Sequence, residues 1–299
     1  MTKTGVIGTG MLGGAVALRL LDTGHDVTVY NRTTAKTQEA VGRGAKLASS
    51  PKEVAENSDL VVIIVRDADA VRQVSFGNDG ITSGIHDGLV IADMSTISPS
   101  ESREISAEFE DVRLKKIDVP VMGGPNVAVT GDLVMMASGD RESFERHRNT
   151  LKDIASRVFF LGSSGDANSV KLAMNLQITM LALGLAEGIT LVRESGMDPL
   201  LFLEVLNSTY FKTGMSEKKA YRMIDGNHTV TFTLANLKKD ISTMVRAAES
   251  LRISLPMTKK AEEIYKSAVN DGLGDTDYTG IIDYIKRNAP KGCGNRVSR

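Results

Sequence analysis

Short apolar runs alternate with segments of helical periodicity over roughly the first 160 residues. The runs are bounded by glycine, asparagine or aspartate and predict strands; they are Gly5–Ile7, Asp26–Tyr30, Leu60–Val65, Leu89–Asp93, Leu114–Val119, Leu133–Ala137 and Val158–Leu161. The segments between them place apolar residues at helical spacing, as from Leu12 to Leu21. This alternation predicts a mostly parallel sheet with helices on both faces, which is the doubly wound α/β class.

The pattern changes after the turn at Gly162–Gly165. No convincing strand follows, and helical periodicity continues to about Arg287. We therefore predict an α/β domain over residues 1–164 and an all-α C-terminal domain over residues 165–299. The first helix of the second domain is expected from Ala167 to Glu194, and two prolines, Pro199 and Pro256, occupy positions typical of helix starts.

Composition adds no signature of nucleic-acid or membrane binding. The 299 residues are 41% hydrophobic, with 36 basic against 37 acidic side chains and a net charge of −1. The most apolar stretch, Val170–Val192, contains Lys171, Asn175 and Glu187, which predicts a buried core helix and not a membrane span. Cys293 is the single cysteine, and no signal sequence is recognised before the first strand, so we expect a reducing, cytoplasmic compartment.

Three glycines follow the first predicted strand at a spacing that is typical of dinucleotide binding. Gly8, Gly10 and Gly13 match G-x-G-x-x-G between a strand and an amphipathic helix, and the next strand completes the unit. The first glycine permits a tight turn, the second lets a pyrophosphate approach the backbone, and the third lets the helix pack closely on its strand. The pattern predicts a Rossmann-type domain whose cofactor-binding residues include Gly8, Thr9, Gly10, Met11, Leu12 and Gly13. A glycine-rich turn without a ligand would leave this order of elements unexplained.

The end of the second strand favours NADP over NAD. About 20 residues beyond the glycines, a carboxylate would bind the ribose hydroxyl of NAD and repel the 2′-phosphate of NADP, but this position holds Asn31. Arg32 follows, with a guanidinium suited to a phosphate, and Thr33 adds a hydroxyl donor. Alternatively, Asn31 caps the next helix and Arg32 is a solvated surface charge, in which case the choice between NADP and NAD stays open.

A polar stripe lies on the long helix predicted for the second domain. Asn168, Lys171, Asn175 and Thr179 fall on one face of a helix that is otherwise almost entirely apolar. The residues alone leave two interpretations of Lys171 open: a structural lysine that snorkels or forms an ion pair, or a general acid/base in a partly desolvated cleft, where its pKa would be lowered. Asn175, one turn away, is suited to orienting a substrate oxygen.

A third cluster, Asp118–Pro125, comes directly after the fifth predicted strand. Ligands of doubly wound sheets bind at the carboxyl ends of the strands, so this proline–glycine turn is expected to face the cofactor crevice. The amides of Gly123 and Gly124 are candidates for holding a carboxylate. The alternative is a tight turn that needs its glycines only for positive φ.

Taken together, these segments resemble the β-hydroxyacid dehydrogenase family, which includes 3-hydroxyisobutyrate dehydrogenase and the glyoxylate and succinic semialdehyde reductases. The resemblance covers nearly the whole chain and rests on five motifs in the family's order. They are Gly8–Gly14, Asp93–Pro99, Asp118–Gly124, Gly165–Asn175 and Phe232–Asp240. It implies hydride transfer between a nicotinamide and a small 3-hydroxy acid or its semialdehyde or keto form, by a homodimer or homotetramer.

The resemblance also assigns roles to residues. Lys171 matches the catalytic lysine that exchanges a proton with the substrate oxygen, and Asn175 matches the residue that holds this oxygen. The remaining substrate-binding residues are Met122, Gly123, Gly124, Lys239 and Asp240, and the further cofactor contacts are Val65, Arg66, Thr96 and Lys239, which closes over the nicotinamide end. No metal site is predicted.

Departures from the family's pattern bear on the substrate. Met122 stands where the family usually has a serine that binds the substrate carboxylate, and Val127 and Asp132 replace a glycine and a threonine. We therefore expect a head group other than that of hydroxyisobutyrate. Two other functions stay open: an imine reductase, although such relatives usually lack the lysine, and a non-catalytic nucleotide-binding module.

Overall fold

The computed structural model describes residues 2–288 of the chain, and the inference drawn from Cys293 lies outside them. Nine strands form one sheet: β1 (Lys3–Ile7), β2 (Asp26–Tyr30), β3 (Lys46–Leu47), β4 (Leu60–Ile63), β5 (Val90–Asp93), β6 (Lys115–Asp118), β7 (Val121–Met122), β8 (Leu133–Gly139) and β9 (Ala155–Phe160). Their order is β3-β2-β1-β4-β5-β6-β8, with β7 also on β8 and β9 on the other edge of β8. The six strands from β3 to β6 are parallel, whereas β8 runs antiparallel to β6 and β7. The predicted doubly wound class is confirmed.

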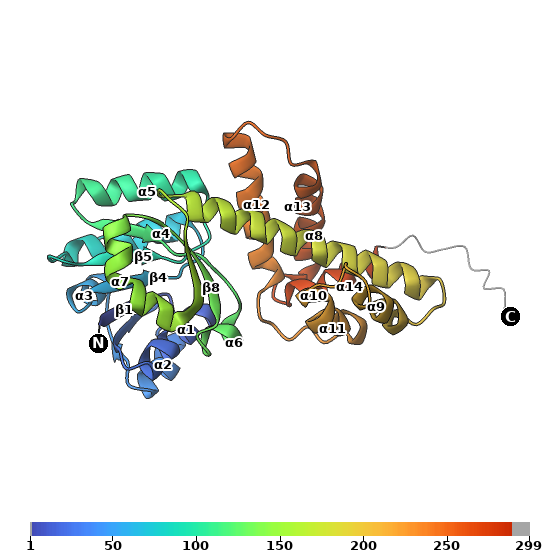
Figure 1. Ribbon diagram of the computed structural model, residues 1–299, viewed down its shortest axis with the longest axis horizontal. Helices are drawn as coiled ribbons and strands as arrows, with labels where there is room; N and C mark the ends of the chain where they lie inside the picture. The colour runs from blue at the N-terminus through green and yellow to red at the C-terminus, as the bar shows by residue number, and fades with distance from the viewer. Residues whose placement is uncertain (1, 289–299) are drawn as a thin grey trace. The chain divides into compact units, whose positions relative to one another are not determined.

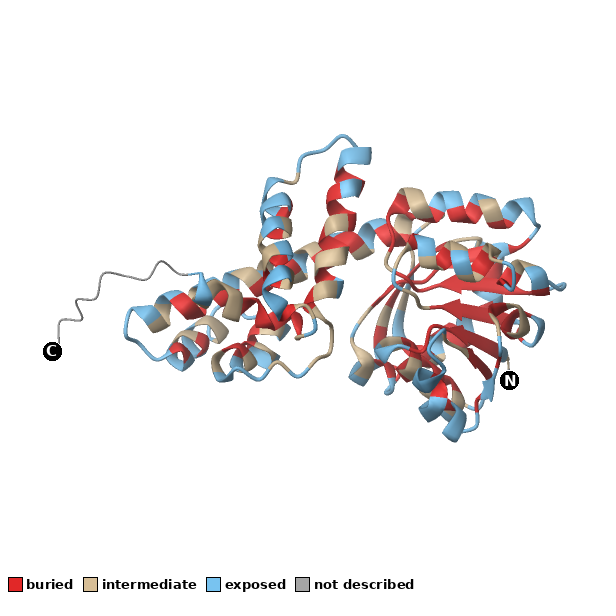
Figure 2. Ribbon diagram, turned by 180° about the vertical axis from the view of Figure 1, so that it is seen from behind, coloured by how far each residue is buried: buried red, intermediate tan, exposed pale blue. Residues whose placement is uncertain are grey.

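Helices cover both faces of this sheet (Figure 1). They are α1 (Met11–Asp22), η1 (Thr34–Thr37), α2 (Gln38–Gly42), α3 (Pro51–Glu56), α4 (Ala68–Phe76), η2 (Ile81–Gly84), α5 (Pro99–Asp111), α6 (Pro125–Ala128) and α7 (Arg141–Ile154). Alternate residues of each strand serve the two faces: Val62 packs with α1 and α7, and its neighbours Val61 and Ile63 pack with α3, α4 and α5. The strands are therefore buried on both sides, as Figure 2 shows.

The chain beyond β9 is helical, as the sequence predicts. The helices are α8 (Asp166–Glu194), α9 (Pro199–Asn207), α10 (Gly214–Lys218), α11 (Ala220–Asp225), α12 (Leu234–Ser250), α13 (Pro256–Ala268), the π-helical η3 (Val269–Leu273), η4 (Tyr278–Gly280) and α14 (Ile281–Arg287). Both prolines expected at helix starts are the first residues of α9 and α13. The one extended pairing in this part of the described chain is a single bridge between Thr233 and Asp277.

The chain divides into two compact units, and the division falls within α8. Unit 1 holds the residues up to Met174 together with Arg246–Arg252; unit 2 holds Asn175–Val245 and the residues from Ile253 onward. Unit 1 contains the whole sheet. Unit 2 is built of helices.

A predicted strand ends early where a backbone N–H donates to a side chain and not to a neighbouring strand. The third predicted strand was expected to reach Val65, but β4 ends at Ile63 and the Val65 N–H donates to the Ser95 hydroxyl (3.1 Å) instead of to a neighbouring strand. The two-residue strands β3 and β7 were not predicted, because two residues carry no readable period.

Helix α8 also has the length and mean hydropathy (1.4 over 18 residues) of a membrane-spanning helix, and 44% of that window is buried within the protein. Its buried residues include the polar Asn175 and Thr179 as well as the apolar Ala182 and Ile189. The Thr179 hydroxyl donates to the Asn175 carbonyl (2.9 Å). This buried part of α8 packs as a core helix does.

Candidate functional site

The glycine loop after β1 has the geometry that a dinucleotide requires. Gly8 has φ +97°, and a Cβ there would lie 2.1 Å from the Ile64 carbonyl oxygen; a Cβ at Gly13 would lie 1.9 Å from the Gly8 carbonyl oxygen. Gly10 is exposed at the N-cap of α1, and a Cβ there would meet nothing within 4 Å. Two glycines are thus required by the fold, whereas the third leaves open space at a helix N-terminus, where a pyrophosphate fits.

Asn31 links this loop to the end of β2. Its Oδ1 accepts a hydrogen bond from the Thr9 N–H (3.2 Å), and its Nδ2 donates to the Thr33 carbonyl (2.9 Å). Asn31 therefore shapes the loop and does not cap the next helix, whose N-cap is Thr33. Arg32 and Thr33 are exposed beside it, and the Thr9 hydroxyl is buried without a partner.

The remaining predicted cofactor contacts follow β4 and β5. Val65 is half-buried and is fixed by its bond to Ser95, while Arg66 is exposed with its Nε 3.9 Å from Asp67. Thr96 is half-buried and directly follows Ser95, whose N–H donates to Asp93 Oδ1 (2.9 Å). These positions lie at the carboxyl ends of adjacent parallel strands, on the same sheet edge as the glycine loop.

Lys171 lies against the turn after β6. Its side chain is half-buried, and its Nζ donates to the Val121 carbonyl (2.7 Å) and lies 3.3 Å from the Met122 Sδ. The structure thus brings the predicted catalytic lysine and the family-atypical methionine into contact within unit 1.

The turn itself needs its first glycine. Gly123 has φ +124°, and a Cβ there would meet the Leu133 side chain at 2.6 Å. Gly124 is the N-cap of the short helix α6, and its carbonyl accepts from Val127 and Ala128 (3.0 Å each). The positive φ and the close contact together explain why position 123 holds glycine, and they do so without any bound ligand.

Unit 2 brings together Asn175, Lys239 and Asp240. The Asn175 Nδ2 donates to Asp240 Oδ2 (2.7 Å), and Lys239 Nζ lies 2.6 Å from Asp240 Oδ1. Asn175 and Asp240 are buried, and the Asn175 Oδ1 accepts no hydrogen bond. Asp240 therefore fixes the orientation of the Asn175 amide, whose oxygen is buried.

Comparisons with known proteins show the family of the chain. A profile of the NAD binding domain of 6-phosphogluconate dehydrogenase matches residues 3–162, and a profile described as NAD-binding of NADP-dependent 3-hydroxyisobutyrate dehydrogenase matches residues 165–285. Glyoxylate/succinic semialdehyde reductase 2 of Arabidopsis thaliana is 33% identical over 282 residues, which are 94% of this chain and 79% of the reductase. The chain belongs to the β-hydroxyacid dehydrogenase family.

Solved structures place it within the same family of NAD(P)-dependent oxidoreductases. The crystal structure of 3-hydroxyisobutyrate dehydrogenase from Salmonella typhimurium has a TM-score of 0.86 at 28% identity and covers 95% of this chain and 99% of that one. An imine reductase from Myxococcus stipitatus in complex with NADP+ has a TM-score of 0.64 at 22% identity, over 95% of this chain and 99% of that one. The imine reductase shares the fold, whereas the β-hydroxyacid dehydrogenase matches more closely.

Sequence analysis missed a buried charge cluster in this β-hydroxyacid dehydrogenase. Lys116 on β6 is buried, forms a short ion pair with Asp118 and lies 3.9 Å from Asp93. Burial by itself would raise the pKa of Asp118, but Lys116 and the hydrogen bonds from Ser102 and Gly165 outweigh it and hold this pKa below its usual value. Burial raises the pKa of Asp93, and the Lys116 ammonium offsets only part of that rise. The available signal was a lysine two residues before an aspartate in a predicted strand, since that spacing puts both on one face of the sheet.

A second buried carboxylate, Asp277, was also missed. It accepts hydrogen bonds from the Thr231 N–H (2.9 Å), the Thr279 hydroxyl (2.9 Å) and the Lys219 ammonium (3.2 Å). Burial would raise the pKa of Asp277, but the Thr231 and Lys219 contacts hold it below its usual value. Asp277 thus fixes the segment leading to Phe232 and α12, and no short-range pattern joins residues this far apart in the chain.

Proposed function

We propose that the protein is an NADP-dependent reductase or dehydrogenase that transfers a hydride between the nicotinamide and a small 3-hydroxy acid or its semialdehyde or keto form. The observation that carries the proposal is the placement of Lys171, whose ammonium is held at the Asp118–Gly124 turn by the Val121 carbonyl. Family membership supplies the reaction class, and this contact supports Lys171 as the proton donor at the carboxyl ends of the strands.

The chemistry divides between cofactor and protein. NADPH, when bound, supplies the hydride that is added to the carbonyl carbon. Lys171 gives a proton to the carbonyl oxygen as this bond forms and takes it back in the oxidation, since a positioned ammonium is an effective general acid. Asn175, whose amide is oriented by its bond to Asp240, holds the substrate oxygen.

The cofactor preference rests on Arg32. The end of β2 carries Asn31, so it offers no carboxylate to bind a ribose hydroxyl, and the Asn31 side chain is already bonded to Thr9 and Thr33. The exposed guanidinium of Arg32 follows directly. A guanidinium pairs with a 2′-phosphate through charge-assisted hydrogen bonds. These features support NADP over NAD.

The substrate class follows from Met122. A thioether beside the Lys171 ammonium replaces a hydroxyl donor with a weak acceptor, so the turn offers one donor fewer to a substrate carboxylate. We infer a small aldehyde acid with a head group other than that of hydroxyisobutyrate.

The deciding experiment measures initial rates with NADPH and NADH against glyoxylate, succinic semialdehyde, methylmalonate semialdehyde, tartronate semialdehyde and sulfolactaldehyde. Wild type and Met122→Ser are compared side by side. Turnover of one aldehyde with NADPH supports the reductase and names its substrate. If the wild type reduces none of these compounds but Met122→Ser does, the turn binds a substrate outside the panel.

The same assay, extended to cyclic imines and combined with a titration of NADPH, separates the alternatives. Turnover of cyclic imines but of no aldehyde identifies an imine reductase, and the retained Lys171 argues against this outcome. NADPH binding without turnover of any substrate identifies a non-catalytic module.

We further propose a cytoplasmic homo-oligomer. Large apolar side chains are exposed within residues 191–211 of unit 2, among them Leu191 (70%), Val205 (65%) and Phe211 (59%). Apolar exposure on this scale is typical of a protein–protein interface.

A further inference from the structure

The carboxylate of Asp118 bonds to two segments of unit 1 that bear on the proposed site. Asp118 itself ends β6, four residues before Met122. Its Oδ2 accepts from the Gly165 N–H (2.7 Å), directly before α8, and from the Ser138 hydroxyl (2.9 Å), which in turn accepts from the Ala167 N–H (3.1 Å). The carboxylate therefore ties the start of the helix that carries Lys171 to the strand that leads to Val121.

The other carboxylate oxygen of Asp118 bonds to Lys116 and Ser102. The Ser102 hydroxyl of α5 donates to Asp118 Oδ1 (2.6 Å) and accepts from Lys116 Nζ (3.1 Å). Lys116 also lies 3.9 Å from Asp93, which anchors the turn carrying Thr96 through the Ser95 N–H. Every member of the cluster is buried, so its hydrogen bonds are shielded from competing water.

We propose that Lys116, Asp118 and Ser102 are positioning residues for Lys171: the buried ion pair sets the distance between the start of α8 and the turn after β6, and thereby holds the Lys171 ammonium at the Val121 carbonyl. This inference rests on the proposed function of Lys171. An ion pair suits the task because Asp118 accepts four hydrogen bonds at once, which only an ionised carboxylate can do.

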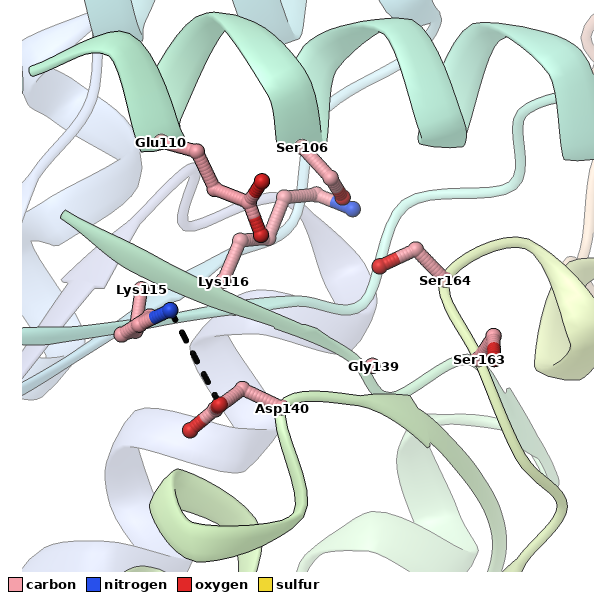
Figure 3. Close-up of a pocket in the computed structure, with 8 residues that line it drawn as sticks. All are labelled: Ser106, Glu110, Lys115, Lys116, Gly139, Asp140, Ser163 and Ser164. Atoms are coloured by element: carbon pink, nitrogen blue, oxygen red, sulfur yellow. Dashed lines mark ion pairs between the residues drawn. The ribbon is translucent and has the colours of Figure 1, made fainter. Parts of the chain in front are cut away.

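A neighbouring serine provides a matched control. Ser106 lies one turn after Ser102 on α5, is also buried, and its hydroxyl has no hydrogen-bond partner. It lines a pocket of about 220 Å³ together with Lys116, Ser163 and Ser164 (Figure 3). Ser102→Ala and Ser106→Ala make the same change in the same helix, but only the first removes a bond to Asp118.

The serine variants are the sharper test, because Lys116→Met would leave a buried carboxylate without its partner and risks loss of folding. Alanine is a better helix former than serine, so both serine variants are expected to fold. Each is compared with wild type by steady-state kinetics and by NMR of labelled lysine side chains, in which the Lys171 Cε and Nζ resonances are assigned with Lys171→Arg.

We expect Ser102→Ala to move the Lys171 resonances and to lower kcat about 3- to 10-fold, with the Kd of NADPH within twofold of wild type. Ser106→Ala is expected to change none of these. Unmoved Lys171 resonances in Ser102→Ala, or equal shifts in both variants, would overturn the positioning role. If wild type turns over no aldehyde, the proposed function fails, and the resonances still decide whether Asp118 and its partners position Lys171.

Discussion

Lys171 is a half-buried lysine whose ammonium donates to a backbone carbonyl and lies against a thioether. Both contacts hold the ammonium at the turn after β6.

Replacing this lysine tests its chemical role. Lys171→Ala is expected to lower kcat by roughly 10² to 10⁴, the usual contribution of a positioned acid or base, while the Kd of NADPH changes little. Initial rates with whichever aldehyde of the panel the wild type turns over, together with fluorescence titration of NADPH, measure both. An unchanged kcat would remove Lys171 from the mechanism.

Arg32 is the residue on which the cofactor preference depends. Arg32→Glu places a negative charge where the 2′-phosphate of NADP is expected, so the Kd of NADPH should rise about 10- to 100-fold more than that of NADH. Titration of both cofactors into one variant provides the internal control. Equal effects on the two would show that Arg32 does not contact the 2′-phosphate.

At the scale of elements, the packing of α1 on β1 depends on one of two adjacent glycines. A Cβ at Gly13 would meet the Gly8 carbonyl at 1.9 Å, whereas the nearest atom to a Cβ at Gly14 is the Thr9 carbonyl oxygen at 3.9 Å. Gly13→Ala must therefore displace the helix or the glycine loop, and Gly14→Ala need not.

We expect Gly13→Ala to lower the thermal midpoint and to weaken NADPH binding by tenfold or more, about 1.4 kcal/mol. Gly14→Ala should leave the fold intact and can stabilise α1 by up to about 1 kcal/mol, because alanine is the better helix former. Differential scanning fluorimetry measures the thermal midpoints of the two variants, and titration with NADPH measures their affinities. Similar losses of stability and NADPH affinity in both variants would mean that the close approach of Gly13 to the Gly8 carbonyl is not what requires glycine here.

At the scale of the whole molecule, the buried carboxylates predict a dependence of stability on pH. The pKa of Asp277 is lowered in the folded state, so its stabilisation is fully present above the pKa of the unfolded chain, about 3.9, and is lost as pH falls through the lower folded value. Removing the carboxylate should abolish that part of the acid sensitivity.

Asp277→Asn is expected to lower the free energy of unfolding by about 3 kcal/mol at pH 7 and by progressively less below about pH 4. Urea unfolding at several pH values measures the difference. Asp271→Asn is the control, since Asp271 is exposed and six residues away. A difference from wild type that stays constant down to pH 2 would show that the charge of Asp277 contributes nothing.

Self-association is the other property of the whole molecule that can be tested. Val205→Glu puts a charge among the exposed apolar side chains of residues 191–211 and is expected to shift a homo-oligomer toward the monomer. Light scattering after size exclusion measures the mass. A monomeric wild type would contradict the proposed assembly.

The fold class and the glycine motif could be read from the sequence without the structure. The apolar run that begins at Leu60 and the glycine spacing at Gly8–Gly13 extend over only a few residues, so both can be read from the chain. The run forms β4, and the glycines form the loop between β1 and α1. The helical polar stripe of Lys171 and Asn175 was legible for the same reason. Strand ends were less certain, since the Val65 N–H is taken by a side chain 30 residues away.

The hydrogen-bond partners of the buried polar residues could be seen only in the folded chain. Asp118 bonds to Gly165, Asn31 to Thr9, and Asp277 to Thr231, across 47, 22 and 46 positions of the chain. Local periodicity reports which face of an element is buried, but a buried polar group must be matched by whichever donor or acceptor the packing brings within 3 Å. That matching is a property of the folded chain, because folding alone removes the water that would otherwise satisfy each group.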